Sequence, residues 1–417
     1  MKGEMTMNKI SGNAVVGQSG GPTSAINATL AGVISGCLES GIEKIYGMKN
    51  GIEGFLNEEL LELHKYFDSP ECENLKLLSL TPAAALGSCR KKLKDDETAA
   101  KMYEIFEKYD ISYFFYIGGN DSMDAVARLT EYANAHPGLR KMHFIGVPKT
   151  IDNDLVMTDH TPGFGSAAKY IACAMQEIMR DCSVYKTKAV TIVEIMGRDA
   201  GWLTASAALT KAVTGVGPAL IYLPECAFSE EQFIADLKNE FENGEHPYIV
   251  VAVSEGLRHA DGSYAAEAAM SGAVDSFGHK YLSGTGKYLE ELVREKIGCK
   301  VRSVEVNILQ RCAGHILSKT DIEESLTVGR KATDLAFSGE SGKMAAYVRK
   351  GEGENYRCDV VGMDVAKIAN AIKKVPREFI NEKANGVTDE CVAHILPLIA
   401  GECDIPYKNG IPCHFEF

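Results

Sequence analysis

The feature that most constrains the fold of this chain is a repeated order of segments, in which a strand pattern runs into a glycine-rich turn and then into a helical pattern. Three such units precede residue 150, with glycine turns at 17–24, 81–94 and 118–122. Parallel strands need crossover connections, and a helix packed on the sheet is the usual one. The order therefore predicts an α/β protein whose first part is a doubly wound parallel sheet.

The same order returns beyond residue 163. The expected elements are a helix opened by residues 161–166 with a periodic apolar face over 167–182, a helix capped by Ser229, and strands at 189–195, 219–223, 248–253 and 301–309. This second series of strands and helices predicts a second domain built like the first, with a boundary near residue 163. We expect loops from Asp261 to Gly286, where glycine, serine and alanine are frequent and periodicity is poor.

Composition limits the classes of function. The 417 residues carry a formal charge of −13, which opposes non-specific binding to polyanions, so we expect no nucleic acid partner. There is no apolar signal core and no run near the roughly 18 apolar residues needed to span a bilayer. The 12 cysteines are dispersed without a C-x-x-C pair, which favours reduced thiols over disulfides. We therefore expect a cytoplasmic protein that does not bind membranes.

The most crowded polar turn is 148–154, where Lys149, Thr150, Asp152 and Asp154 follow an apolar run. In an open α/β sheet, ligands bind beyond the carboxyl ends of the strands. An isolated Asp-Asn-Asp turn is more often a solvated loop, and the other motifs of this chain favour a functional site instead. The turn at 17–24 is also ambiguous, because it is neither a Walker A sequence nor a dinucleotide fingerprint.

Acids and bases recur at strand ends in both halves of the chain. They are Asn120, Asp121, Asp152, Asp154, Arg198, Glu255, Arg302 and Arg311. The anionic groups could bind a metal and supply a general base, and the cationic groups facing them could bind phosphate. This combination suits phosphoryl transfer, in which positioning and charge neutralisation supply most of the catalysis.

These residues closely resemble the phosphofructokinase family. The matching motifs are Ser19-Gly20-Gly21, Gly118-Gly119-Asn120-Asp121-Ser122, Pro148 to Asp154, Met196-Gly197-Arg198, Ser254-Glu255-Gly256 and Gln310-Arg311, in the family's order over about three quarters of the chain. The resemblance implies two similar Rossmann-like α/β/α domains with the active site in the cleft between them. The expected domains are 1–163 plus about 310–365, which would bind the donor and Mg²⁺, and 164–309 plus about 366–417, which would bind the sugar phosphate.

The resemblance also implies roles for individual residues. Asp152 would be the general base, and Thr150, Lys149 and Arg198 would complete the catalytic set. The implied donor-binding residues are Gly20, Gly21, Arg90, Gly119, Asn120, Asp121, Ser122 and Lys149. The implied substrate-binding residues are Thr150, Asp152, Asp154, Met196, Gly197, Arg198, Glu255, Arg302 and Arg311, and the implied Mg²⁺ ligands are Asn120, Asp121 and Asp154. Arg302 falls where the family donates an arginine across a subunit interface, which implies a homodimer or homotetramer.

Two positions favour inorganic pyrophosphate as the donor. ATP-dependent members typically have glycine where this chain has Asp121 and Lys149. A carboxylate at 121 obstructs the α-phosphate and nucleoside, and a lysine at 149 offers a compact cation to a diphosphate. We expect reversible conversion of fructose 6-phosphate to fructose 1,6-bisphosphate. An ATP-dependent enzyme, a non-catalytic sugar-phosphate-binding subunit and sedoheptulose 7-phosphate as an additional acceptor remain alternatives.

The chain departs from the family pattern at several positions. Asn120 replaces an aspartate associated with Mg²⁺, and Ile308 replaces a histidine near Gln310. Ala189 replaces a second intersubunit arginine, for which Lys186 or Lys188 is a candidate substitute. Ala31 and Ser35 stand where allosteric members have effector-binding arginines, so we expect no regulation by ADP or phosphoenolpyruvate through that site.

Overall fold

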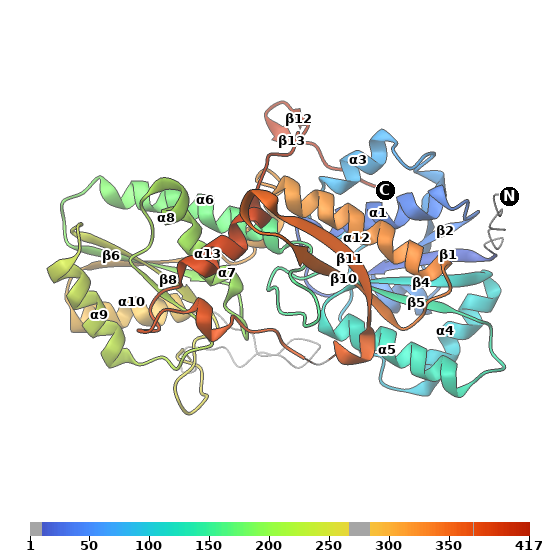
Figure 1. Cartoon of the computed structure of the whole chain (residues 1–417), viewed down its shortest axis with the longest axis horizontal. Coiled ribbons are helices and arrows are strands. Elements are labelled where there is room, and N and C mark those ends of the chain that lie inside the picture. Colours follow the sequence, from blue (N-terminus) through green and yellow to red (C-terminus); the bar gives the residue numbers. More distant parts are fainter. Residues whose placement is uncertain (1–10, 267–283, 370) are drawn as a thin grey trace.

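The structure of this chain is a computed structural model that describes residues 11–266, 284–369 and 371–417. Two sheets covered by helices lie side by side, one on the right and one on the left of Figure 1. The expectation of an α/β fold with parallel sheets is confirmed. The domain limits given above stay a prediction.

The larger sheet has seven strands in the order β11-β10-β5-β4-β1-β2-β3. Its strands are β1 (Asn13–Gln18), β2 (Ile45–Met48), β3 (Leu60–Glu62), β4 (Ile111–Gly118), β5 (His143–Pro148), β10 (Lys343–Lys350) and β11 (Arg357–Asp364). The five central strands are parallel, and the edge strands β3 and β11 pair antiparallel with their neighbours. The carboxyl ends of β1, β4 and β5 therefore meet at one edge of the sheet.

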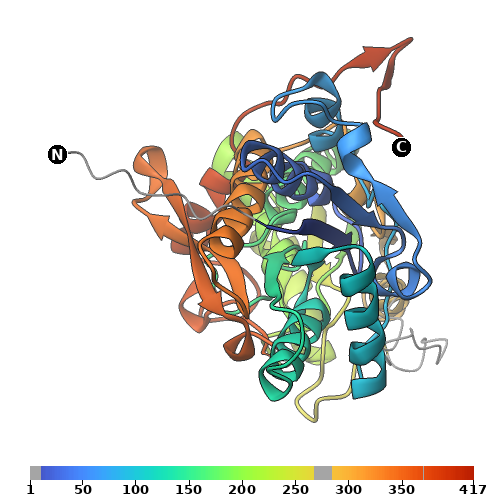
Figure 2. The same ribbon diagram turned by 90° about the vertical axis from the view of Figure 1, so that its right-hand side faces the viewer.

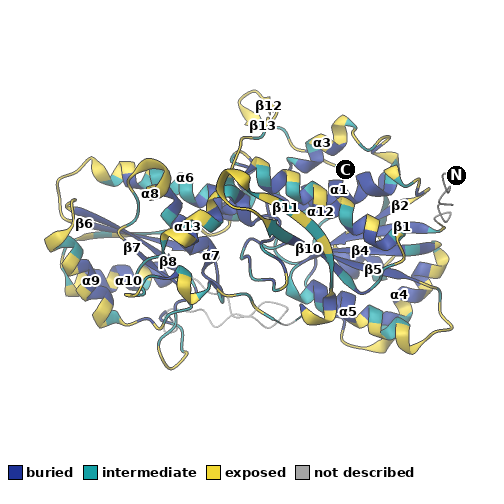
Figure 3. Ribbon diagram, viewed as in Figure 1, coloured by how far each residue is buried: buried dark blue, intermediate teal, exposed yellow. Residues whose placement is uncertain are grey.

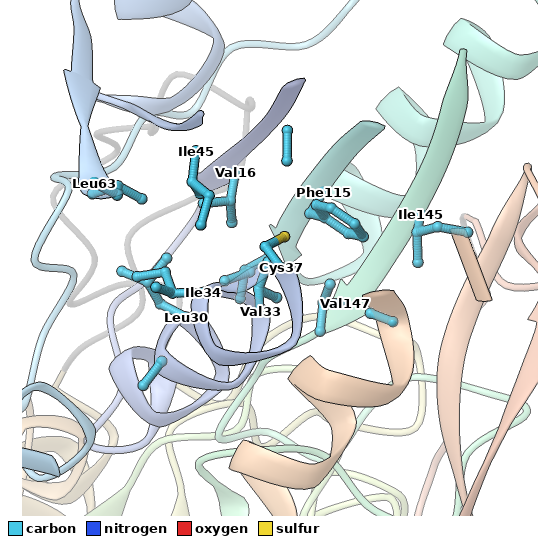
Figure 4. Close-up of a cluster of buried hydrophobic side chains, with 14 of the residues drawn as sticks. Val16, Leu30, Val33, Ile34, Cys37, Ile45, Leu63, Phe115, Ile145 and Val147 are labelled. Carbon is cyan, nitrogen blue, oxygen red and sulfur yellow. The ribbon is translucent and has the colours of Figure 1, made fainter. Parts of the chain in front are cut away.

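Helices cover both faces of this sheet, as Figures 1 and 2 show. One face packs against α1 (Ile26–Glu39), α3 (Glu73–Ser79) and α12 (Lys319–Phe337), and the other against α2 (Gly51–Leu56), α4 (Asp96–Lys108) and α5 (Asn120–Ala135). Along β4, Phe115 and Ile117 face the first group, whereas Phe114 and Tyr116 face the second. Figure 4 shows Phe115 with Val16 and Val33 in the first core. Alternate residues of one strand thus fill two cores.

The smaller sheet has four parallel strands in the order β7-β8-β6-β9. They are β6 (Ala189–Ile195), β7 (Leu220–Tyr222), β8 (Tyr248–Ser254) and β9 (Lys300–Glu305). The helices α6 (Phe164–Ser183), α7 (Trp202–Ala205), α8 (Leu209–Thr214) and α13 (Asp389–Ile395) cover one face, and α9 (Glu230–Asn243) and α10 (Thr285–Lys296) cover the other. The strands are buried along most of their length (Figure 3), except the edge strand β9.

Short elements complete the part of the chain that the structure describes. They are α11 (Leu309–Cys312), the two-residue strands β12 (Tyr407–Lys408) and β13 (Ile411–Pro412), and the 3₁₀ turns at Leu63–Lys65, Ser206–Ala208, Gly353–Asn355, Val365–Lys367, Arg377–Phe379 and Leu396–Ile399. After β9 the chain returns to the larger sheet, where it adds α12, β10 and β11, and it then runs back toward α13.

The structure corrects two expectations about the elements. The glycine turn at 81–94 follows the helix α3 and not a strand. The strand expected at 301–309 ends at Glu305, and α11 begins at Leu309. An alternating pattern alone cannot fix where a strand ends, because a polar turn continues the alternation. The predicted helix cap at Ser229 is confirmed, since its hydroxyl accepts a hydrogen bond from the Gln232 N–H at 3.3 Å. Residues 267–283 of the expected loop region lie outside the described residues.

The helices α1 and α12 approach unusually closely. A Cβ added at Gly32 would lie 2.2 Å from the carbonyl oxygen of Leu326, and one at Gly329 would lie 2.3 Å from that of Thr29. On α1, Ala31 and Ser35 are both buried. All twelve cysteines are free thiols, which confirms that expectation. No helix in the described ranges is both long enough and apolar enough to cross a membrane.

Candidate active site

The ends of strands from both sheets open on one cleft with a volume of about 690 Å³. The larger sheet contributes the turns after β1, β4 and β5, and the smaller sheet those after β6, β8 and β9. The cleft is lined by Ser19 to Thr23, Arg90, Lys92, Gly119 to Ser122, Lys149 to Asp152, Asp154, Glu194 to Met196, Arg198 to Ala200, Glu255, Glu305, Asn307, Ile308, Arg311 and Ile372. Charged side chains of both signs therefore face one space.

The turn after β5 is held tightly against the start of α6. Thr150 N–H donates to the Pro162 carbonyl at 3.3 Å, and the Thr161 hydroxyl donates to the Thr150 carbonyl at 2.7 Å. Asn153 has φ 53° and is fully buried. This left-handed conformation, which asparagine tolerates better than most residues, turns the chain so that Asp152 and Asp154 both line the cleft.

The two carboxyl groups of this turn lie in a field of opposing charges. Burial raises the pKa of Asp152, while the nearby Arg198 and Lys149 oppose that rise. Burial, followed by the charge of Asp152, raises the pKa of Asp154 to about 7. The pair therefore holds one negative charge more readily than two near neutral pH. A bound cation would favour ionisation of both carboxyl groups.

Lys149 lies in the cleft beside the first glycine turn. Its ammonium donates to the Gly21 carbonyl at 2.6 Å, and burial lowers its pKa to about 8. Gly20 has φ 76°, and an added Cβ there would lie 3.3 Å from the Lys149 ammonium. An added Cβ at Gly21 would lie 3.3 Å from the Arg311 guanidinium. The two glycines thus allow two cations to approach the backbone closely.

The start of α5, which follows β4, lies between the turns after β1 and β5. The residues Asn120, Asp121 and Ser122 of its first turn line the cleft. Asp121 forms an ion pair with Lys92 at 3.2 Å. The Asn120 amide nitrogen lies 3.5 Å from a carboxylate oxygen of Asp154. The Asn120 amide oxygen is buried, and no group in the described part of the chain donates a hydrogen bond to it.

The smaller sheet supplies Met196, Arg198 and Glu255. Gly197 N–H donates to the Glu255 carboxylate at 3.2 Å, and burial raises the pKa of Glu255 to about 8. A Cβ added at Gly256 would lie 1.9 Å from the Arg198 carbonyl oxygen, so this position requires glycine. Gln310 joins the two turns of this side, because its amide oxygen accepts from Met196 N–H at 3.2 Å and its amide nitrogen donates to the Asn307 carbonyl at 2.8 Å.

Nearly all of the expected site residues line this cleft, and two do not. Gly197 is not a lining residue, although its N–H donates to the Glu255 carboxylate, which does line the cleft. Arg302 lies on the edge strand β9, where its side chain is 50% exposed and pairs with Asp181 at 3.6 Å. The structure therefore does not bring Arg302 into the cleft of its own chain.

Other lining residues were not assigned from the sequence. The clearest are Glu194, Asp199, Glu305, Asn307 and Ile372. Glu194 has a readable signal, because it is a carboxylate inside the apolar strand β6, and burial raises its pKa to about 7. Glu305 and Asn307 were hidden by the strand expected to run to residue 309. Ile372 had no local signal.

A second group of polar side chains lies outside the cleft. His160, Glu324 and Cys358 have candidate metal-ligand atoms within 4.8 Å of one another. Both ring nitrogens of His160 already have partners, however, with Asp159 at 2.9 Å and Glu324 at 2.7 Å. The arrangement is therefore an imidazole held between two carboxylates.

The fold and the cleft together define a class of phosphotransferase with two α/β units. The family model described as phosphofructokinase matches residues 13–336, and the chain belongs to this family. It is 40% identical over 410 residues to the pyrophosphate–fructose 6-phosphate 1-phosphotransferase of Halomonas elongata, covering 96% of this chain and 94% of that protein. It is 38% identical to the protein of that name from Methylococcus capsulatus, with the same coverage. The crystal structure of a pyrophosphate-dependent phosphofructokinase from Nitrosospira multiformis superimposes with a TM-score of 0.85 at 36% identity, covering 97% of this chain and 95% of that one.

Proposed function

We propose that this chain is a reversible, Mg²⁺-dependent and pyrophosphate-dependent 6-phosphofructokinase. The observation that carries the proposal is the cleft itself, in which Asp152 lies between the donor-side cation Lys149 and the sugar-side cation Arg198. The names of the full-length relatives give the same substrates. The cytoplasmic location and the absence of a nucleic acid partner remain predictions.

In the proposed reaction, Asp152 accepts the proton of the sugar 1-hydroxyl as that oxygen attacks the nearer phosphorus of pyrophosphate. The bridging P–O bond breaks, and orthophosphate leaves with its electron pair. Burial raises the pKa of Asp152 above that of a free aspartate, which makes it a better proton acceptor. Lys149 and Arg311 face the donor turn at Gly20 and Gly21 and would offset the charge that moves to the leaving phosphate.

The residues at the start of α5 suit a magnesium ion. Asn120 offers a buried amide oxygen without a hydrogen-bond donor in the described chain, and Asp154 offers a carboxylate oxygen 3.5 Å from the nitrogen of the same amide group. Oxygen ligands of this kind are those that Mg²⁺ prefers. Asp121 would lie at the rim of the site, where Lys92 already pairs with it. A bound Mg²⁺ would neutralise donor charge, and its field would favour ionised Asp154.

Shape and charge at the donor end favour pyrophosphate over ATP. Asp121 and Lys92 form an ion pair in the cleft where glycine would leave room, and the Lys149 ammonium lies beside Gly20 and Gly21. A nucleotide would have to pass this ion pair, whereas a diphosphate would not. Fructose 6-phosphate is the proposed acceptor, with sedoheptulose 7-phosphate an untested second one.

We also propose a homo-oligomer in which Arg302 serves the neighbouring subunit. Its exposed position on the edge strand β9 supports this. Lys188 lies over the Phe241 ring at 4.1 Å, so the exposed Lys186 is the better candidate to replace the arginine missing at Ala189.

The direct test is formation of fructose 1,6-bisphosphate from fructose 6-phosphate and Mg²⁺ with a single donor. We expect turnover with pyrophosphate and little with ATP. Turnover with ATP alone would keep the family and refute the donor assignment. No turnover with either donor would favour a non-catalytic sugar-phosphate-binding protein, which isothermal titration with fructose 6-phosphate would detect.

A further inference from the structure

Lys373 lies directly behind the turn that carries Asp152 and Asp154. It belongs to the segment that follows β11 and passes from the larger sheet toward the smaller one (Figure 1). Its neighbour Ile372 lines the cleft, whereas Lys373 itself does not. The Lys373 backbone N–H donates to the Asp154 carbonyl at 2.7 Å. A residue far along the chain is thus bonded to the acidic turn.

The Lys373 ammonium is fully occupied in this position. It donates to the Asn153 side-chain oxygen at 3.1 Å, to the Thr158 carbonyl at 3.1 Å and to the Asp159 carbonyl at 2.7 Å. An ammonium has three N–H groups, and here each has an acceptor. Removing a charged ammonium group from water is unfavourable unless its N–H groups form hydrogen bonds. The Lys373 ammonium therefore favours a conformation in which these three acceptors stay close to it.

One of these acceptors controls the shape of the acidic turn. Asn153 is fully buried with φ 53° and lies between Asp152 and Asp154. Its side-chain oxygen is bonded to Lys373, and its backbone directs the two neighbouring carboxylates into the cleft. Lys373 therefore holds the residue about which the turn is built, and it also holds the chain that leaves the turn at Thr158 and Asp159.

The same segment is bonded to the smaller sheet. The Trp202 indole N–H donates to the Lys373 carbonyl at 3.1 Å. The Glu225 carboxylate accepts from the N–H groups of Gly201 and Val375, each at 2.9 Å. Gly201 and Trp202 follow the sugar-side residues Met196 to Arg198. One segment thus contacts the donor-side turn and the sugar-side turn together.

We propose that Lys373 is a positioning residue for phosphoryl transfer, which fixes the Asp152–Asp154 turn through Asn153 and holds it in register with the sugar-side turn after β6. This inference rests on the proposed function and adds a residue to its site. Lys373 acts through Asn153 and the backbone, without contact with the reacting atoms.

The test compares Lys373→Met with a matched control, Lys169→Met. Lys169 likewise has three acceptors for its ammonium, the carbonyls of Leu317 at 3.0 Å and Gly401 at 2.6 Å and the Glu402 carboxylate at 2.9 Å, but it lies outside the cleft. We expect Lys373→Met to lose on the order of 10²-fold in kcat, since small misplacements of catalytic groups have effects of this size, with the KM for fructose 6-phosphate changed by less than about threefold. We expect Lys169→Met to lose thermal stability while it keeps kcat.

A second variant tests the route through Asn153. Asn153→Gly keeps the left-handed backbone but removes the acceptor, so it should also lower kcat, and the double variant with Lys373→Met should be no slower than the slower single variant. Equal kcat for the Lys373→Met and Lys169→Met variants would overturn the proposal, as would independent effects of the Lys373 and Asn153 substitutions. If Lys373→Met does not fold, an unchanged kcat in Asn153→Gly overturns it. A wild-type protein without pyrophosphate-dependent turnover would instead refute the proposed function.

Discussion

Asp152 is the side chain on which the proposed chemistry depends most directly. It is partly buried in the cleft, near Arg198 and Lys149, and its backbone N–H donates to the Thr150 hydroxyl at 3.1 Å. Asp152→Asn keeps the shape and removes the proton acceptor. We expect kcat to fall by on the order of 10² to 10⁴, with fructose 6-phosphate binding close to that of the wild type. Steady-state kinetics and isothermal titration measure the two quantities, and a parallel loss of binding would show that the side chain mainly supports the turn.

The ion pair of Asp121 and Lys92 resolves an electrostatic conflict. A carboxylate at the donor end of the cleft would repel pyrophosphate unless a cation offsets it, and Lys92 lies 3.2 Å away. We expect Lys92→Met to raise the KM for pyrophosphate by about three- to tenfold, a range set by the partial exposure of the pair. The KM for fructose 6-phosphate should change little.

The matched control for this pair is the double variant Lys92→Met with Asp121→Asn. If Lys92 acts by neutralising Asp121, removing both charges should recover much of the affinity for pyrophosphate. A double variant as weak as Lys92→Met alone would show that Lys92 contacts the donor directly. Ionic strength should separate the same alternatives, because screening weakens the repulsion of an uncompensated carboxylate.

At the scale of elements, an ion network joins the chain after the acidic turn to α12 and β10. His160 lies between the carboxylates of Asp159 and Glu324, and the Arg349 guanidinium of β10 donates to Asp159 at 3.0 Å. Burial opposes protonation of His160, but its hydrogen bonds to the two carboxylates outweigh burial and raise its pKa. The protonated imidazole therefore stabilises the folded state.

The sign of the resulting pH dependence follows from this shift. Because the folded pKa of His160 lies above its unfolded value of about 6.5, its contribution is complete below that value and is lost as the pH rises through the folded pKa. We expect the free energy of unfolding in urea to fall over that range, by up to about 1.4 kcal/mol for each unit of pKa shift. His160→Gln should remove this part of the decline.

A control for general histidine effects is His136→Gln. His136 is exposed at the end of α5, outside the ion network. Replacing His136 should not change how the free energy of unfolding falls as the pH rises, compared with the wild type. If His160→Gln and the wild type show the same dependence on pH, then His160 is neutral in the folded protein and the network has a different protonation state.

At the scale of the whole molecule, the sequence predicted those features that leave a pattern among neighbouring residues. The strands β4, β5, β6 and β8 have strong apolar runs, and the polar groups just beyond them meet because parallel strands end at one edge of a sheet. The edge strands β3 and β11 gave weaker local patterns. Lys373 could not be foreseen, because its partner Asn153 lies 220 residues away. A long-range hydrogen bond leaves no periodicity in a single sequence.

The position of Arg302 leads to a prediction about the assembly as a whole. Its exposed side chain does not reach the cleft of its own chain, so we expect each site to use Asp152 from one subunit and Arg302 from the next. Arg302→Ala and Asp152→Asn should then each be nearly inactive alone. When the two variants are unfolded together and refolded as a mixture, some sites combine an intact Asp152 with an intact Arg302. If equal amounts of the two variants assemble randomly into dimers, about a quarter of wild-type kcat should return. Half of the sites have an intact Asp152, and in half of those the partner subunit supplies an intact Arg302. Each variant refolded alone is the control, and a mixture no more active than the sum of these controls would place the action of Arg302 within its own subunit.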